Sequence, residues 1–444
     1  MKRRKRLIVC ITTYERADIV QEFLDMYYLN YKSMGIDLVI YDSSVSDKTE
    51  QICTNTPFFD SKKEYCRLDS SIHSNVKFIK ILENPHLARE YDYVWICQEA
   101  LACSSTGLKR IVGRLDSHND LIHIGCGLIP LCDEKEYMNA QTYFSELAWH
   151  ATLYGAVILR TDSFLNKVSW DDVESKCLQD EKLSYSQISF YFNRINDLNS
   201  FHAIYLDLGT GNLIESKKKK KPGWYANTFK VLCEDWINTI DALPDNYRDK
   251  AEVIRQLPKN AMLQNEMDLM GFKLDNAYNM DIYQSYRERL KRLLPFSDGC
   301  LKQIAGAEKE DIYYIVRDLD AEYLKPLQSQ VGKRKDIYLY GAGVYGDVVF
   351  QLLEDYGYSV KGFIVTQKRM DRYLGCPVYA WKEIRNDVVV VLTVGKRYFD
   401  EIKKNLQKTM KQELLIADIE LNIYAKSRKR VLKQLETYEK SCLS

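Results

Sequence analysis

The chain has 444 residues, enough for two or three domains with their own cores, and its 46% hydrophobic and 28% charged residues are ordinary for a globular protein. A net charge of +1 argues against a dedicated nucleic-acid binder, and twelve cysteines without a CxxC pair indicate neither a zinc site nor a disulfide framework. The basic start is followed by an apolar run over residues 7–11, too short for a signal peptide or a membrane span, so we expect a cytoplasmic protein.

The first half of the chain alternates between strand and helix patterns. Apolar residues from Ala17 onward recur at helical spacing and predict a helix that ends near Gly35. Apolar runs predict strands at residues 7–12, 37–41, 77–82, 91–97, 121–125, 154–160 and 202–206. This order implies right-handed crossovers and an α/β fold, whose parallel sheet binds its ligand at the carboxyl ends of the strands.

The sequence pattern changes twice in the second half of the chain. Residues 222–332 have a mainly helical pattern, and the charged stretch 331–335 is typical of a linker. A fresh strand at 337–340 then begins a second, smaller α/β unit, and residues 421–440 predict a charged amphipathic helix. We therefore expect domains at residues 1–221, 222–332 and 333–444, with residues 1–330 able to fold without the last one.

Polar residues follow the first two predicted strands. Thr12, Tyr14 and Arg16 follow the first, and Asp42 with Ser43 closes the second. A carboxylate there can accept hydrogen bonds from a base or a ribose, and Tyr14 offers an aromatic face. The alternative is that Asp42 and Ser43 only cap the next turn.

The segment IVCITTYERADIVQEFLDMYYLNYKSMGIDLVIYDSS resembles the opening of the large inverting GT-A glycosyltransferase family. The likeness covers about residues 7–215. It implies a Rossmann-like nucleotide-sugar domain, with UDP as the expected nucleotide, held by Thr12, Tyr14, Arg16, Asp42, Ser43 and Gln98. Replacement of Asp42 is then expected to weaken nucleotide binding and leave the fold intact.

The fourth predicted strand ends in Gln98-Glu99, where the resembled family has an Asp-x-Asp motif that coordinates a cation on the donor diphosphate. Glu99 is therefore the expected ligand of Mn²⁺ or Mg²⁺, which would offset the charge of the leaving group. The motif lacks its first carboxylate. Asp116 and Asp120 are the substitutes if Glu99 does not bind the metal.

Two further segments hold candidate substrate residues. Trp149 and His150 precede a glycine-led strand, where an indole and an imidazole suit a sugar pocket, although Trp149 as a core residue is the alternative. The resembled family places its catalytic base about 80 residues after the metal motif, and Asp180-Glu181 stand at that distance. Asp171 and Asp172 are nearby competitors, and the helix dipole alone also favours acids in a first turn.

The basic run Lys217–Lys221 is typical of a solvated loop. The alternatives are closure over the donor diphosphate, or contact with anionic lipid near a lipid-linked acceptor, which would place the protein peripherally at the inner face of a membrane.

The C-terminal unit contains Gly341, Gly343 and Gly346 as a GxGxxG motif between a strand and a helix, where phosphate can approach the backbone. The next strand ends in Thr366-Gln367 without an acid for a dinucleotide ribose, which disfavours NAD. The segment resembles the Rossmann-like units appended to bacterial polysaccharide glycosyltransferases and sugar acetyltransferases. It implies nucleotide-sugar or phosphate binding, or a purely architectural role.

Together these patterns predict inverting transfer of a sugar from a nucleotide sugar to an acceptor hydroxyl. By resemblance, the acceptor is a bacterial surface glycan or a lipid-linked glycan, and no nucleic-acid partner is expected. The rival hypotheses are a non-catalytic nucleotide-sugar-binding scaffold and, more weakly, an NAD-linked oxidoreductase. Nothing in the sequence indicates an oligomeric state.

Overall fold

In the computed structural model, residues 6–115, 118–129, 132–178, 184–218, 225–259, 263–331, 336–383 and 388–442 are described. The chain forms two compact units. The first comprises residues 1–260 with 292–294, and the second comprises residues 261–291 with 295–444. The division therefore falls inside the helical region, away from the expected boundaries at residues 221 and 332.

The first unit is built on an eight-stranded mixed sheet with the order β3-β2-β1-β4-β8-β6-β9-β7. Its strands are β1 (Leu7–Thr13), β2 (Asp37–Asp42), β3 (Tyr65–Arg67), β4 (Tyr93–Gln98), β6 (Leu121–Gly125), β7 (Glu134–Tyr137), β8 (Val157–Arg160) and β9 (Ala203–Asp207). Strands β1 to β4 pair in parallel, while β8 runs antiparallel to both β4 and β6. A separate antiparallel pair joins β5 (Leu101–Cys103) to β10 (Leu213–Glu215).

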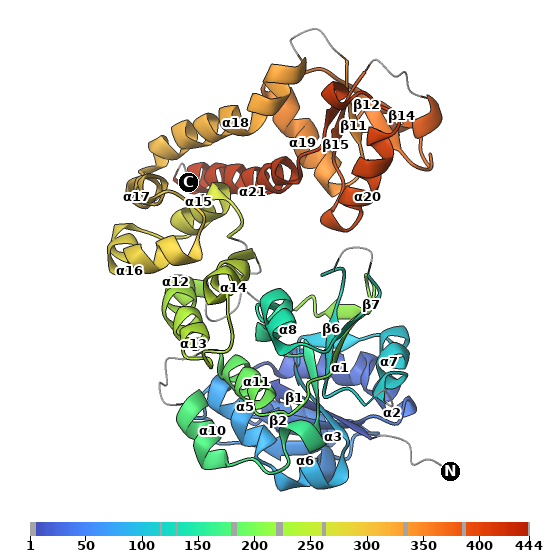
Figure 1. Cartoon of the computed structure of the whole chain (residues 1–444), viewed down its shortest axis with the longest axis vertical. Helices are drawn as coiled ribbons and strands as arrows, with labels where there is room; N and C mark the ends of the chain where they lie inside the picture. The colour runs from blue at the N-terminus through green and yellow to red at the C-terminus, as the bar shows by residue number, and fades with distance from the viewer. Residues whose placement is uncertain are drawn as a thin grey trace. The chain divides into compact units, whose positions relative to one another are not determined.

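Helices cover both faces of this sheet (Figure 1). The helices of the first unit are α1 (Ala17–Met26), α2 (Tyr28–Ser33), α3 (Lys48–Asn55), α4 (Ser61–Glu64), α5 (Ser74–Leu82), α6 (Pro85–Glu90), α7 (Ser105–Val112), α8 (Ala140–Leu147), α9 (Thr161–Phe164), α10 (Trp170–Cys177), α11 (Ser186–Asn196), α12 (Thr228–Lys230), α13 (Ile237–Asp241) and α14 (Lys250–Gln256). A π-helical turn, η4 (Val231–Trp236), joins α12 to α13.

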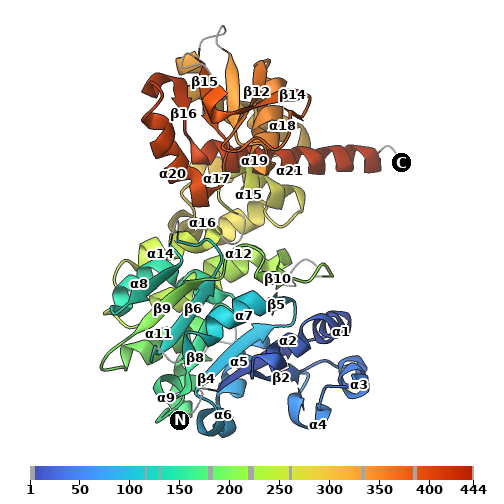
Figure 2. The same ribbon diagram turned by 90° about the vertical axis from the view of Figure 1, so that its right-hand side faces the viewer.

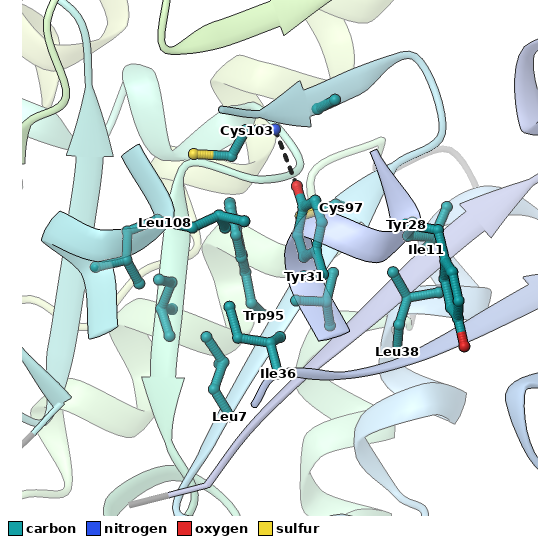
Figure 3. Packing of buried hydrophobic residues seen from close by; sticks show 14 of the residues in the cluster. Leu7, Ile11, Tyr28, Tyr31, Ile36, Leu38, Trp95, Cys97, Cys103 and Leu108 are labelled. Carbon is teal, nitrogen blue, oxygen red and sulfur yellow. Dashed lines mark hydrogen bonds between the residues drawn. The ribbon is translucent and has the colours of Figure 1, made fainter. Parts of the chain in front are cut away.

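The core on one face joins α1, α2 and α7 to alternate residues of the strands, including Leu7 and Ile11 of β1 (Figure 3). Tyr31 reaches into this core, where its hydroxyl accepts a hydrogen bond from the backbone N–H of Cys103 at 2.9 Å. All seven residues of β1 are buried, as a strand covered on both faces requires. The predicted α/β fold of the N-terminal region is thus confirmed.

One predicted strand is wrong. Residues 77–82 lie in helix α5, and the short strand β3 occupies the third position instead. Phe78, Ile79, Ile81 and Leu82 are buried by helix packing, and a short apolar run does not distinguish a buried helix from a buried strand.

The second unit contains a six-stranded sheet with the order β13-β14-β12-β11-β15-β16 (Figure 2). Its strands are β11 (Ile337–Tyr340), β12 (Val360–Val365), β13 (Arg372–Tyr373), β14 (Cys376–Ala380), β15 (Val389–Leu392) and β16 (Leu415–Ile416). All except β13 pair in parallel, and their order is that of a doubly wound sheet. The expected second α/β unit is present.

Helices complete this unit: α15 (Glu266–Leu274), α17 (Asp298–Gly306), α18 (Lys309–Val331), α19 (Val344–Asp355), α20 (Lys396–Gln407) and α21 (Ile419–Cys442), while α16 (Met280–Leu293) ends at the boundary. Helix α21 packs against α15, α18 and α19. The helices that the sequence assigns to a separate middle region therefore belong partly to the unit of the second sheet.

Ion pairs to the buried carboxylates of Asp268 and Asp320 hold α21 in place. Arg428 Nε donates to both carboxylate oxygens of Asp320, at 2.8 and 2.9 Å, and its Nη1 donates to Asp355 at 2.8 Å. Arg430 Nη2 donates to the buried carboxylate of Asp268 at 2.8 Å. Among the described residues, the cations that pair with Asp268 and Asp320 both come from α21.

Candidate functional site

The site lies where β1, β2 and β4 end at one edge of the first sheet. The parallel register places Thr12 opposite Gln98, and Thr13 opposite Asp42. Glu99 follows β4 directly. The structure thus brings together the strand ends that the sequence singled out.

Hydrogen bonds fasten the loops after β1 and β2 to each other. The Glu15 carboxylate accepts from the backbone N–H groups of Val45 and Ser46, at 2.7 and 2.9 Å, and from the Ser46 hydroxyl at 2.8 Å. The Ser44 hydroxyl accepts from the Glu15 N–H at 2.7 Å. Hydrogen bonds from Ser46 also hold the pKa of Glu15 below its ordinary value. Next to Glu15, the side chain of Tyr14 is 51% exposed, so its ring can stack on a planar ligand.

Asp42 is completely buried and is engaged by protein groups. Its Oδ1 accepts from the Ser44 N–H at 2.8 Å, and its Oδ2 accepts from Tyr65 at 2.9 Å and from Arg67 at 3.3 Å. Through these hydrogen bonds, the buried carboxylate of Asp42 stabilises the conformation of the loop after β2. Its direct contact with a nucleotide stays a prediction.

Ser43 and Thr12 are also buried. The Ser43 hydroxyl has no hydrogen-bond partner among the described residues, and the Thr12 hydroxyl donates to the Cys97 carbonyl at 3.3 Å. Gln98 is half-buried at the end of β4. The nucleotide-binding roles of these residues are likewise predictions.

Glu99 forms an ion pair with Arg16. Arg16 Nη1 donates to Glu99 Oε1 at 2.8 Å, with 4% of the Glu99 side chain exposed and 38% of the Arg16 side chain exposed. Burial raises the pKa of Glu99, while Arg16 and Lys77 act in the opposite direction. A buried carboxylate thus anchors an exposed guanidinium at the edge of the sheet.

Lys77 is a site residue that the sequence reasoning missed. It lies in the first turn of α5, is almost fully buried, and donates from Nζ to the Thr13 carbonyl at 3.0 Å. Burial lowers the pKa of Lys77, and the nearby carboxylates of Glu99 and Asp42 oppose that shift. The sequence signal was a lysine inside the apolar run 77–82. Because we predicted that run to be a strand, Lys77 was not assigned to the site.

Trp149 and His150 lie at the same edge, because they precede β8, which runs antiparallel to β4. His123 connects two neighbours: its Nε2 lies 2.8 Å from His150 Nδ1, and its Nδ1 lies 2.8 Å from the Tyr143 hydroxyl. Trp149 is half-buried, and its indole donates to the Glu146 carbonyl at 2.8 Å.

This hydrogen-bond chain can run in either direction, because each neutral imidazole carries one N–H. If Tyr143 donates to His123 and His123 donates to His150, the Nε2–H of His150 is left over; in the reverse order, the hydroxyl hydrogen of Tyr143 is left over. Burial lowers the pKa of His150 to about 4. His150 is therefore neutral, and in the first of the two orders its Nε2–H can donate to a ligand oxygen.

Asp180 and Glu181, the predicted catalytic bases, lie outside the described residues, as does Asp116. Next to that segment, Ser184 donates to the buried carboxylate of Asp235, a further residue that the sequence reasoning missed. Burial raises the pKa of Asp235, and its second oxygen has no partner among the described residues.

The competing acids do not join the site. Asp120 precedes β6, which runs parallel to β4, so it lies at the opposite edge of the sheet and binds Ser163 and the His202 N–H. Asp172 pairs with Lys176 on α10 at 2.9 Å, and Asp171 is exposed on the same helix.

Of the basic run 217–221, the structure describes residues 217 and 218. Lys218 Nζ donates to the Asp18 carbonyl at 3.1 Å, whereas residues 219–221 are outside the described ranges.

In the second unit, the glycine motif forms the turn between β11 and α19. Gly341 has a φ of 124°, and a side chain there would overlap the Thr393 carbonyl, whereas a Cβ on Gly343 would meet open space. A Cβ on Gly346 would overlap the Gly341 carbonyl. Close packing therefore explains two of the three glycines, and phosphate binding by this loop stays a prediction.

Within the described ranges, no three His, Cys, Asp or Glu side chains are grouped so that they could hold a metal, and no helix is long and apolar enough to cross a membrane. Each cysteine side chain that the structure describes is a free thiol.

No protein-family model and no curated protein sequence matches this chain. Among solved structures, a mannosyltransferase from Pyrobaculum calidifontis, in complex with GDP-Man and Mn²⁺, is 13% identical over 68% of this chain and 87% of its own, with a TM-score of 0.36. Glucosyl-3-phosphoglycerate synthase from Mycobacterium tuberculosis, in complex with Mn²⁺, UDP and glucosyl-3-phosphoglycerate, is 11% identical over 54% of this chain and 81% of its own, with a TM-score of 0.35. Likenesses this distant carry no argument about the reaction.

Proposed function

We propose that this protein is a glycosyltransferase that moves a sugar from a nucleoside-diphosphate sugar, expected to be a UDP-sugar, to an acceptor hydroxyl. The observation that supports this most is the placement of three unlike groups at one sheet edge: the exposed ring of Tyr14, the guanidinium of Arg16 that Glu99 anchors, and the imidazole of His150. A base, a phosphate and a sugar hydroxyl need these three kinds of partner.

The proposed chemistry is a single displacement with inversion. The bond between the anomeric carbon and the phosphate oxygen breaks, and its electron pair stays on the phosphate. The acceptor oxygen bonds to the same carbon, and its proton passes to a carboxylate, for which Asp180 or Glu181 is the proposed base. Tyr14 would stack on the nucleotide base, and Asp42 would keep the loop after β2 in shape.

A divalent cation at Glu99 was expected from the resemblance. The residues present fit it poorly: Glu99 Oε1 already accepts from Arg16, the carboxylate is almost fully buried, and Lys77 adds a second positive charge nearby. A cation at Glu99 would have to displace Arg16. That role stays a prediction, and no step of the proposed reaction depends on it.

The acceptor is proposed to be a growing glycan or a lipid-linked glycan of a bacterial surface polysaccharide. This part rests on the resemblance of residues 7–215 alone. Peripheral contact with the inner face of a membrane, through the basic run 217–221, is an extension of the same proposal.

The test is turnover by the full chain. UDP-, GDP- and dTDP-sugars are incubated with bacterial lipid-linked glycans, and release of the nucleoside diphosphate and the anomeric configuration of the product are measured. We expect release that depends on the acceptor, and a product of inverted configuration. Tight binding of a nucleotide sugar without turnover would favour the scaffold, while NADH binding would revive the oxidoreductase.

A further inference from the structure

Arg16 and Lys77 reach the ends of β1 and β4 from different segments of the chain. Arg16 precedes the first residue of α1, and Lys77 belongs to the first turn of α5. Each side chain uses only some of its N–H groups in hydrogen bonds to the described residues. Among the described residues, Arg16 has one side-chain hydrogen bond for five N–H groups, and Lys77 has one for three.

The anchors of both cations are rigid. Glu99 is buried and holds one edge of the Arg16 guanidinium at 2.8 Å, while the Thr13 carbonyl at the end of β1 holds Lys77 Nζ at 3.0 Å. Two hydroxyls have no hydrogen-bond partner among the described residues, those of Thr13 at the end of β1 and of Ser43 directly after β2, and both side chains are at least nine-tenths buried. Anchored cations lose little conformational entropy when an anion binds, because they are already in place.

Glu99 suits the role of an anchor better than that of a metal ligand. Its charge is balanced by Arg16 directly, and Lys77 lies within electrostatic reach. A divalent cation there would be repelled by two positive side chains, whereas a diphosphate would be attracted to both.

We propose that Arg16 and Lys77 hold the diphosphate of the donor without a divalent cation, and that Glu99 is the positioning residue for Arg16. This rests on the proposed function. As the bond between the sugar and the phosphate breaks, the leaving nucleoside diphosphate gains one negative charge, which the two cations offset. The proton of the acceptor goes to the base, so atoms and charges balance.

The experiment measures binding of UDP, GDP and dTDP to the full chain by calorimetry, with EDTA or with Mn²⁺, and with the matching nucleosides as a reference. We expect at least one nucleoside diphosphate to bind equally well in both conditions. Arg16→Gln and Lys77→Met should each weaken it about tenfold or more and leave nucleoside affinity unchanged. Lys77→Arg should restore part of the loss. Lys109→Met, an exposed lysine on α7, is the matched control and should change nothing.

Two results would overturn the inference in distinguishable ways. Affinity that rises at least tenfold with Mn²⁺, and loses this gain in Glu99→Gln, would place a metal at Glu99 and leave the proposed function standing. Absence of any nucleotide binding in either condition would remove the proposed function and this inference together. Should Lys77→Met fail to fold, Arg16→Gln decides the question, because Arg16 is partly exposed.

Discussion

His123 Nε2 lies 2.8 Å from His150 Nδ1, and both rings are buried. Burial holds the pKa of His150 at about 4 and that of His123 well below its ordinary value. In the unfolded chain both rings titrate near 6.5, so between pH 6.5 and about 4 the unfolded chain binds more protons. The free energy of unfolding should therefore fall as the pH is lowered through this window.

The contribution of one ring is at most about 1.4 kcal/mol per pH unit. His150→Asn, which retains an acceptor for His123, should flatten the pH dependence of urea unfolding below pH 6.5. His202→Gln, at an exposed histidine, should leave the wild-type slope. Equal slopes for His150→Asn and the wild type would show that the pKa of His150 is the same in the folded and the unfolded chain.

Asp42→Asn should destabilise the first unit by about 2 kcal/mol, because a buried carboxylate that binds Arg67, Tyr65 and a backbone N–H loses its charge. Nucleoside diphosphate affinity should fall with it, since the loop after β2 depends on that carboxylate. Asp47→Asn, at a side chain that is 72% exposed, should change stability by less than about 0.5 kcal/mol. A fully stable Asp42→Asn protein would contradict the packing at this loop.

Gly343→Ala should leave the stability of the second unit unchanged, whereas Gly346→Ala should lower it by roughly 2 kcal/mol because its Cβ meets a backbone carbonyl. Thermal unfolding measures both. Gly343→Ala is thus the variant of choice for testing phosphate binding at this loop. A loss of stability in Gly343→Ala would show that other atoms occupy the position of the added Cβ.

Asp320→Asn should cost the second unit about 3 kcal/mol, since Arg428 would remain buried without a full counter-charge. Urea unfolding should show this loss, and Asp318→Asn on the exposed side of α18 should not. If the two variants unfold alike, the ion pair contributes nothing to stability.

Much of the first sheet could be predicted because β1, β2, β4 and β6 are apolar runs between clear turn signals. Residues 77–82 could not, since burial by neighbouring helices mimics the composition of a strand. Tertiary packing, which no local pattern reveals, decided that segment.

The sequence predicted where in the fold the site lies, but it did not predict which side chains of the site contact each other. Strand ends of a parallel sheet must share an edge, so Arg16 and Glu99 could be expected near each other. Their ion pair joins residues 83 positions apart and depends on the register between β1 and β4. The burial of Asp42 depends similarly on Tyr65 and Arg67, which lie on a strand too short to recognise.

The pairing of Arg428 and Arg430 with Asp320 and Asp268 also bears on how the protein is made. Asp320 of α18 emerges from the ribosome 108 residues before Arg428, and Asp268 of α15 emerges 162 residues before Arg430. Two carboxylates that are buried in the folded protein are therefore synthesised well before the arginines that pair with them. The first unit can complete its sheet during synthesis, but the second must stay open until residues 419–442 have appeared. A chaperone that recognises nascent chains should therefore dwell on the region between α15 and α18.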